Sequence, residues 1–218
     1  LAMWSSYEAY ALSRADMTGS EYSGRYENYT FGELFAAPFQ GEHLSRSSFW
    51  VPLAAMAAAN IGLDLAADGG RSSVFATGRS YIGSREVPIL VGFLSTAVLS
   101  AVTYDFVGIG EEAISRDLEY KELSIGLGVI PAKIINGITF PALHIPQEVR
   151  AGYGAGQILV DFAYRSAATL GLQWAYDRGG LPDAVALHMW IDTFTSLIDF
   201  LLLSGTPAVA TVSFNVKL

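Results

Sequence analysis

A small set of polar side chains in this apolar sequence has the types and spacing that hydrolysis requires. They are Glu111, Glu112, Arg116, His144, His188 and Asp192. Carboxylates and imidazoles are the usual general acids and bases of enzymes, so these groups can activate a water molecule. One glutamate with two histidines is also an acceptable ligand set for Zn²⁺. The sequence therefore predicts a hydrolytic site, with a water-activating carboxylate or a zinc ion at its centre.

Helical geometry groups these residues into polar stripes, each on one helix face. On the last apolar segment the stripe spans about 60° of arc, and it consists of His188, Asp192, Thr195 and Asp199. A second stripe consists of Lys133, Asn136, Phe140 and His144. Glu112 and Arg116 form an i,i+4 pair, with Asp105 on the same side of an unbroken helix, whereas Glu111 points about 100° away. We expect the three stripes to converge in one cavity, with different roles for the two glutamates.

The elements that carry these stripes are apolar segments. Of the 218 residues, 51% are hydrophobic and 16% are charged, against about 25% charged in soluble domains. The segments are 48–63, 87–110, 123–144, 155–176 and 181–204, and most reach the ~20 residues that cross a bilayer. The stretches "DGGRSS", "HIPQEVRAGYG" and "DRGGLPD" between them are typical of loops.

Two interpretations of the apolar segments remain open. A soluble helical protein can hold a few paired polar groups in its core, and a polytopic membrane protein turns such groups towards the bundle interior. Glycine- and alanine-rich stretches such as "LAAMAAANIG" suit close helix packing in lipid and favour the second interpretation. We therefore predict an all-α, polytopic transmembrane helical bundle, with membrane lipid as a partner.

The chain divides into three parts by composition. Residues 1–46 are polar and aromatic and suit an interfacial position; residues 47–205 form the predicted transmembrane core. Residues 206–218 form a tail whose alternating apolar residues suggest a strand over 210–218. The net charge of −8 without a basic run argues against a nucleic-acid partner. The absence of cysteine excludes disulfides and thiolate chemistry.

Each polar feature also has a purely structural explanation. A Glu–Arg pair at i,i+4 is usually a solvated helix face, and a single buried histidine is usually a hydrogen-bonded core residue. For Asp161 and Arg165 we favour a structural ion pair between helices. His43 is the third histidine, lies in the polar N-terminal part, and receives no role.

Taken in order, three motifs resemble the signature of a known family. "EEAISR" (111–116), "FPALH" (140–144) and "HMWID" (188–192) are similar to E-E-x-x-x-R, F-x-x-x-H and H-x-x-x-N/D. These belong to the CAAX-processing and bacteriocin-processing intramembrane proteases, the CPBP or Abi family of glutamic endopeptidases. The resemblance covers about residues 87–204 and includes the helix spacing between the motifs.

The resemblance implies a role for each motif residue. Glu111 would be the general base, with His144 holding the attacking water, and His188 and Asp192 would stabilise the oxyanion. Glu112, Arg116 and Phe140 would support the site. The implied protein is a multi-pass integral membrane endopeptidase, of a prokaryotic cytoplasmic membrane. It would process the terminus of a membrane-associated peptide, or of a lipidated or membrane-anchored protein.

Some residues depart from the family pattern, and alternatives stay open. An ionised Asp192 would oppose an oxyanion and would rather orient His188, and Pro141 is expected to kink the helix before His144. We favour a mechanism without cofactors, while zinc held by Glu111, His144 and His188 is the alternative. A non-catalytic family member acting in bacteriocin immunity or partner binding is the alternative function.

Overall fold

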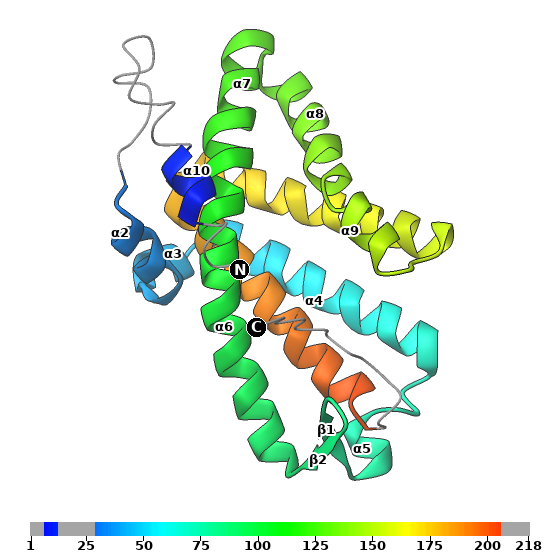
Figure 1. The fold of residues 1–218 in the computed structure, drawn as a ribbon. Helices are drawn as coiled ribbons and strands as arrows, with labels where there is room; N and C mark the ends of the chain where they lie inside the picture. Colours follow the sequence, from blue (N-terminus) through cyan, green and yellow to red (C-terminus); the bar gives the residue numbers. More distant parts are fainter. Residues whose placement is uncertain (1–6, 13–28, 206–218) are drawn as a thin grey trace.

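The computed structural model describes residues 7–12 and 29–205 and confirms the all-α prediction (Figure 1). Residues 7–12 form a short helix. The labelled helices are α2 (Phe31–Ala36), η1 (Ala37–Phe39), α3 (Gly41–Leu44), α4 (Ser47–Asp68), α5 (Val74–Thr77), α6 (Ile89–Glu112), η2 (Ala113–Tyr120), α7 (Lys121–Leu127), α8 (Val129–Ala142), α9 (Ile145–Arg150) and α10 (Ala155–Leu203). The two strands are β1 (Ser80–Ile82) and β2 (Arg85–Val87). The strand predicted over 210–218 lies outside the described residues.

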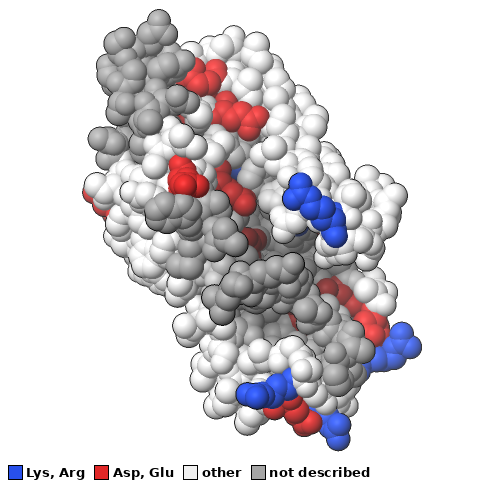
Figure 2. All heavy atoms as spheres, in the orientation of Figure 1, with Lys and Arg blue, Asp and Glu red and all other residues white. Residues whose placement is uncertain are grey.

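Three helices in the described part of the chain are long and apolar enough to cross a membrane. They are α4, the continuous rod of α6, η2 and α7 (Ile89–Leu127), and α10. Large apolar side chains project from the outer faces of these helices, for example Leu90, Leu94 and Val98 of α6. On the face shown in Figure 2 most side chains are uncharged. The protein is therefore a membrane protein.

The 49-residue helix α10 consists of two arms that meet at Gly180. The backbone of Gly180 is not helical, with φ 73° and ψ −162°, and Pro182 follows in the first turn of the second arm. The Tyr164 hydroxyl lies 3.1 Å from the Thr195 hydroxyl, so the arms (155–179 and 181–203) lie side by side. The loop predicted for "DRGGLPD" is therefore wrong, because one glycine makes the turn.

The apolar segment 123–144 is not one helix. Gly128, with φ 91°, separates α7 from α8, and α8 runs back beside the rod (Figure 1). The predicted loop "HIPQEVRAGYG" is also partly wrong, because residues 145–150 form α9. The structure thus places Phe140 and His144 at the end of a returning helix and not in the middle of a span.

Small residues allow the long helices to approach closely. A Cβ atom added at Gly171 would lie 2.7 Å from Pro52 Cβ, and one at Gly92 would lie 2.6 Å from the Phe200 ring. The first contact joins α4 to the first arm of α10, and the second joins α6 to the second arm. Backbone approach at small residues gives packing contacts in lipid, where the hydrophobic effect between helices is weak.

A short β-hairpin connects α5 to α6 and was not predicted. Strands β1 and β2 pair antiparallel, with Tyr81 opposite Glu86. Gly83 in the turn has φ 60°, which suits a two-residue hairpin loop. The amide of Gly205 donates to the carbonyl of Ser72 over 2.6 Å, so the end of α10 is fixed to the link between α4 and α5.

The described N-terminal helices pack on the opposite end of the bundle. Leu34 of α2 is fully buried in a cluster with Ile109 of α6 and Val185 of α10. The Trp190 indole donates to the carbonyl of Pro38 over 2.8 Å. These contacts fix η1 and α2 over the region where the two arms of α10 meet.

Candidate active site

The two adjacent glutamates occupy different environments at the end of α6. The Glu112 side chain is fully buried, whereas the Glu111 side chain is 33% exposed. The helix is unbroken through Gly108 and Gly110, so the 100° rotation between neighbours turns Glu112 inwards and Glu111 to the edge of the bundle.

Glu112 joins the first and third motifs. Its Oε2 lies 3.1 Å from Nε of Arg116, which is also fully buried, and its Oε1 lies 2.7 Å from Nδ1 of His188. A carboxylate accepts hydrogen bonds, so this contact assigns a proton to Nδ1 and directs Nε2 of His188 away from Glu112. Glu112 therefore sets the orientation of the His188 ring.

The second motif is positioned by a buried polar network around Asn136 of α8. Its amide donates to the Ser115 carbonyl and hydroxyl over 3.0 and 2.9 Å, and to Glu119 Oε2 over 2.9 Å. The Gln173 amide donates to Asn136 Oδ1 over 3.0 Å. These bonds tie α8 to η2 and α10. Because η2 is a π-helix, whose hydrogen bonds run from i to i+5, the network lies where the α-helical pattern is interrupted.

Phe140 lies at the centre of the motif residues. Its ring centroid is 5.3 Å from that of His144 and 6.4 Å from that of His188, both edge to face. The Arg116 guanidinium carbon lies 4.2 Å from the centroid of the same ring, which is a cation–π distance. Pro141 is near the end of α8, and His144 is the second residue of the link 143–144 and the N-cap of α9.

Glu111 faces both histidines. Its Oε2 lies 4.0 Å from Nε2 of His144 and 3.8 Å from Nε2 of His188. Asp192 Oδ2 lies 3.4 Å from the same nitrogen of His188. The structure thus brings one carboxylate and two imidazoles from α6, the α8–α9 link and α10 around one point.

A cavity of about 290 Å³ opens beside this point. It is lined by Ala9, Gly110, Glu111, Ile114, Ser115, Phe140, Leu143, His144 and Gln147. Glu111 and His144 are its catalytic candidates, and much of the remaining lining is apolar. Ala9 comes from the N-terminal helix of residues 7–12, which had no expected part in the site.

Other residues of the predicted stripes have partners away from the site. Lys133 Nζ lies 2.7 Å from Asp177, and Thr195 contacts Tyr164. Asp199 accepts from the Asn60 amide over 3.0 Å. The prediction that all three stripes converge in one cavity is therefore wrong beyond the motif residues.

Two further predictions on charged side chains change with the structure. Arg165 forms its ion pair with Glu148 of α9, at 3.3 Å. The pair joins two helices, as predicted for Arg165, but the acid is Glu148 and not Asp161. Asp105 is fully buried on the Glu112 side of α6, as the helical geometry predicted. It does not line the cavity.

His43, which received no role, is buried in a contact with the second arm of α10. Its Nδ1 lies 2.6 Å from Asp183 Oδ1, and Arg46 Nη1 lies 2.5 Å from Asp183 Oδ2. Gly179 is required beside this group, because an added Cβ would collide with Arg46 and Asp183. The sequence separation of 140 between His43 and Asp183 leaves no local sequence signal for this contact.

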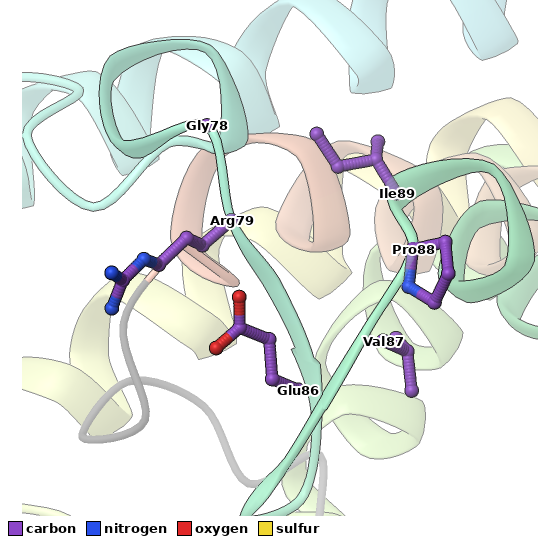
Figure 3. A pocket seen from close by; sticks show the side chains of 6 residues that line it. All are labelled: Gly78, Arg79, Glu86, Val87, Pro88 and Ile89. Atoms are coloured by element: carbon purple, nitrogen blue, oxygen red, sulfur yellow. The ribbon is translucent and has the colours of Figure 1, made fainter.

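A second cavity, of about 480 Å³, lies at the β-hairpin. Its lining is Gly78, Arg79, Glu86, Val87, Pro88 and Ile89 (Figure 3). Arg79, which directly precedes β1, and Glu86 of β2 lie on the side away from Pro88 and Ile89. This lining contains no histidine and none of the motif residues, so the cavity beside Glu111 is the candidate active site.

The donor atoms of the alternative zinc set are separated more widely than zinc requires. Tetrahedral bonds of about 2.0–2.1 Å bring ligand atoms within roughly 3.4 Å of one another, against 3.8 and 4.0 Å for Glu111 and the two histidines. Among residues 7–12 and 29–205, no three His, Cys, Asp or Glu side chains are grouped as a metal site. These three residues would have to move closer together to hold zinc.

His144 lies in the α8–α9 link, outside the three long helices. Burial lowers the pKa of His144 to about 4, and the positive charge of Arg165 acts in the same direction. His144 is therefore neutral at pH 7 and can accept a hydrogen bond at one ring nitrogen while donating at the other.

The described chain combines helices long enough to span a membrane with a candidate hydrolytic site of one carboxylate and two histidines. One comparison with known families agrees with a hydrolytic site. The family model "Type II CAAX prenyl endopeptidase Rce1-like" matches residues 93–194, just under half of the chain. This segment contains all three motifs, so over these residues the chain is similar to the CAAX protease family that the motifs predicted. No curated protein and no solved structure gives a match.

Proposed function

We propose that the protein is an intramembrane endopeptidase in which Glu111 activates the attacking water. The observation that carries the proposal is the position of Glu111 Oε2, 4.0 Å from His144 Nε2 and 3.8 Å from His188 Nε2 at the cavity edge. Both separations are too long for a direct hydrogen bond and suit a water molecule between the groups.

Glu111 and His144 have complementary parts in this reaction. The carboxylate of Glu111 takes a proton from the water as the water attacks the peptide carbonyl, and His144 orients the water by a hydrogen bond. The proton on Glu111 then passes to the leaving amine, so the glutamate returns to its ionised form. General base catalysis of this kind typically contributes 10²–10⁴-fold to the rate.

His188 supplies the donor for the developing oxyanion. Glu112 accepts the hydrogen bond from Nδ1, so His188 can also donate from Nε2 only as the doubly protonated imidazolium. That second N–H faces the cavity side, where Glu111 and Asp192 lie. Asp192, 3.4 Å from Nε2, would orient this N–H, since an ionised aspartate does not itself bind an oxyanion. A positioned donor of this kind typically contributes about 3–4 kcal/mol to transition-state binding.

The proposed arrangement in the membrane is multi-pass, in a prokaryotic cytoplasmic membrane. Helices α4 and α6 and both arms of α10 each contain 22 residues or more, which reaches the length of a bilayer span. The charged hairpin around Arg79 and Arg85 would lie at one surface, and Glu111 near the opposite one. The substrate class is a membrane-associated peptide, or a lipidated or membrane-anchored protein, that is cleaved near one terminus.

The test compares the termini of membrane proteins in host cells that express wild type, Glu111→Gln or Glu86→Gln. Glu86 is an exposed glutamate at the far end of α6 and is the matched control for loss of one negative charge. All three proteins must first fractionate with membranes and, after extraction in detergent, elute at the same volume in size-exclusion chromatography. We expect a defined set of cleaved termini in wild type and Glu86→Gln that is lost in Glu111→Gln.

The catalytic proposal would be overturned if the termini were the same in all three strains while deletion of the whole protein still produced a phenotype. That outcome would favour the non-catalytic, partner-binding alternative. The cleaved sites, where they appear, identify the substrate directly.

A further inference from the structure

The N-terminal helix of residues 7–12 lies outside the family match and yet forms part of the catalytic cavity. The match begins at residue 93, whereas Ala9 lines the cavity together with Glu111 and His144. More than 80 residues of sequence separate Ala9 from the matched segment. The part of the cavity lining formed by Ala9 therefore comes from outside the segment that carries the motifs.

Aromatic contacts hold the N-terminal helix in this place. The rings of Tyr7 and Tyr10 lie 5.6 and 5.5 Å from that of Phe31, which lies 5.5 Å from Phe106 of α6. The Tyr10 hydroxyl donates to the Tyr29 carbonyl over 2.7 Å. Each aromatic pair typically contributes about 0.5–1.5 kcal/mol beyond burial. The helix is thus anchored to α6 five residues before Glu111.

The cavity lining combines two kinds of side chain. Glu111 and His144 are its reactive groups and Ser115 and Gln147 its other polar residues, while Ala9, Ile114, Phe140 and Leu143 supply apolar surface. Ile114 and Leu143 are both exposed large apolar side chains. Glu111 is the one acidic group among the lining residues, and none of them is lysine or arginine. Such a lining favours an uncharged, apolar group and disfavours an anion.

We propose that Ala9 forms the wall of a substrate subsite that takes an apolar side chain next to the bond cleaved at Glu111. The small methyl group of Ala9 sets the upper size of that side chain. At about 290 Å³ the cavity is near the lower limit of ligand sites, so a larger residue at position 9 would remove much of the space. This subsite rests on the proposed endopeptidase function.

The experiment grades the size of residue 9 and records which sites are still cleaved. Cells express wild type, Ala9→Leu, Ala9→Trp or Leu12→Trp, and the rate at which each cleaved terminus appears is measured. Leu12 is on the same helix, is exposed, and does not line the cavity, so Leu12→Trp is the matched control.

We expect cleavage at sites with a large apolar residue beside the bond to fall about tenfold in Ala9→Trp and less in Ala9→Leu. Sites with glycine or alanine there should change less than twofold, and Leu12→Trp should match wild type. A size-dependent response is the readout that a merely structural effect would not give, since misfolding lowers cleavage at all sites together.

Equal rates in all four proteins, or an equal fall at every site in Ala9→Leu and Ala9→Trp, would overturn the subsite. The Glu111→Gln strain separates the two proposals. If Glu111→Gln abolishes cleavage while the Ala9 variants keep the wild-type pattern, only the subsite is wrong. If Glu111→Gln changes nothing, the proposed function itself is wrong.

Discussion

Two groups that each include one residue of the second arm of α10 have the same composition, a carboxylate that bridges a histidine and an arginine. In the Glu112 group, the carboxylate contacts His188 Nδ1 at 2.7 Å and Arg116 Nε at 3.1 Å. In the Asp183 group, it contacts His43 Nδ1 at 2.6 Å and Arg46 Nη1 at 2.5 Å. The histidine of one group and the acid of the other are five residues apart in sequence.

The groups differ in what faces the second nitrogen of each histidine. Nε2 of His188 faces Glu111 at 3.8 Å beside a cavity, whereas Nε2 of His43 faces Glu42 at 3.4 Å, whose side chain is 71% exposed. The first arrangement presents an oriented imidazole to a second acid at the candidate active site. The second joins the start of α4 to the start of the arm. The contact of histidine, carboxylate and arginine alone therefore does not indicate catalysis.

The largest expected effect comes from removing the acid that faces Nε2 of the histidine in each group. Glu111→Gln should reduce proteolysis by about 10²–10⁴-fold, because the general base is lost. Glu42→Gln, the equivalent change at His43, should alter the rate less than twofold. The measurement is the rate at which processed termini form in membranes, at matched protein levels. An equal effect of both changes would remove the distinction between the groups.

Removing the bridging acid should affect stability unequally. Glu112→Ala leaves Arg116 buried without its partner and should destabilise the protein by about 3–5 kcal/mol. Asp183→Ala should cost about 1–3 kcal/mol, because the Arg46 side chain is 38% exposed and can be hydrated. Unfolding of the purified proteins in detergent measures both. A larger loss for Asp183→Ala would show that the Asp183 group is the more important ion pair.

His144 belongs to neither group, and burial lowers its pKa. Its folded-state pKa of about 4 is below the usual 6.5, so the unfolded chain takes up the proton first as the pH falls. The stability that this group contributes is complete above pH 6.5 and is lost as the pH falls towards 4.

Between pH 7 and pH 5 the expected loss of stability from His144 is on the order of 1–2 kcal/mol. His144→Gln should remove that part of the pH dependence. Thermal unfolding in detergent at the two pH values measures it in both proteins. The same pH dependence in wild type and variant would contradict the low pKa of His144.

Metal removal should have the smallest effect. If Glu111 is a base and not a ligand, treatment with EDTA should change the rate of the purified protein less than twofold. Loss of activity that Zn²⁺ alone restores would instead assign Glu111, His144 and His188 as zinc ligands. In that case the Glu112 group would differ from the Asp183 group because its histidine binds a metal.

The sequence predicted which residues come together at the candidate site better than the elements that carry them. The motifs proposed Glu111, His144 and His188, which the structure brings together. Helical geometry predicted different directions for the two glutamates, and the Glu111 side chain is partly exposed whereas that of Glu112 is buried. These signals are local, since each depends on residues within two helical turns.

What could not be predicted depends on contacts between distant residues. His43 and Asp183 are polar residues in different parts of the chain, and nothing local pairs them. The turn inside the predicted segment 123–144 falls at Gly128, and isolated glycines also occur inside α6, for example Gly108. The hydropathy pattern therefore did not indicate which glycine ends a helix and which is packed within one.

The π-helix η2 between the first motif and α7 bears on how the length of this chain can vary during evolution. A π-helical turn holds one more residue than an α-helical turn. Loss of one residue from 113–120 can therefore be absorbed by closing η2 into an α-helix. Loss of one residue from α6 would rotate all that follows by about 100° and carry Glu112 away from His188. Sequences related to this one should therefore contain single-residue deletions in η2 but not in α6.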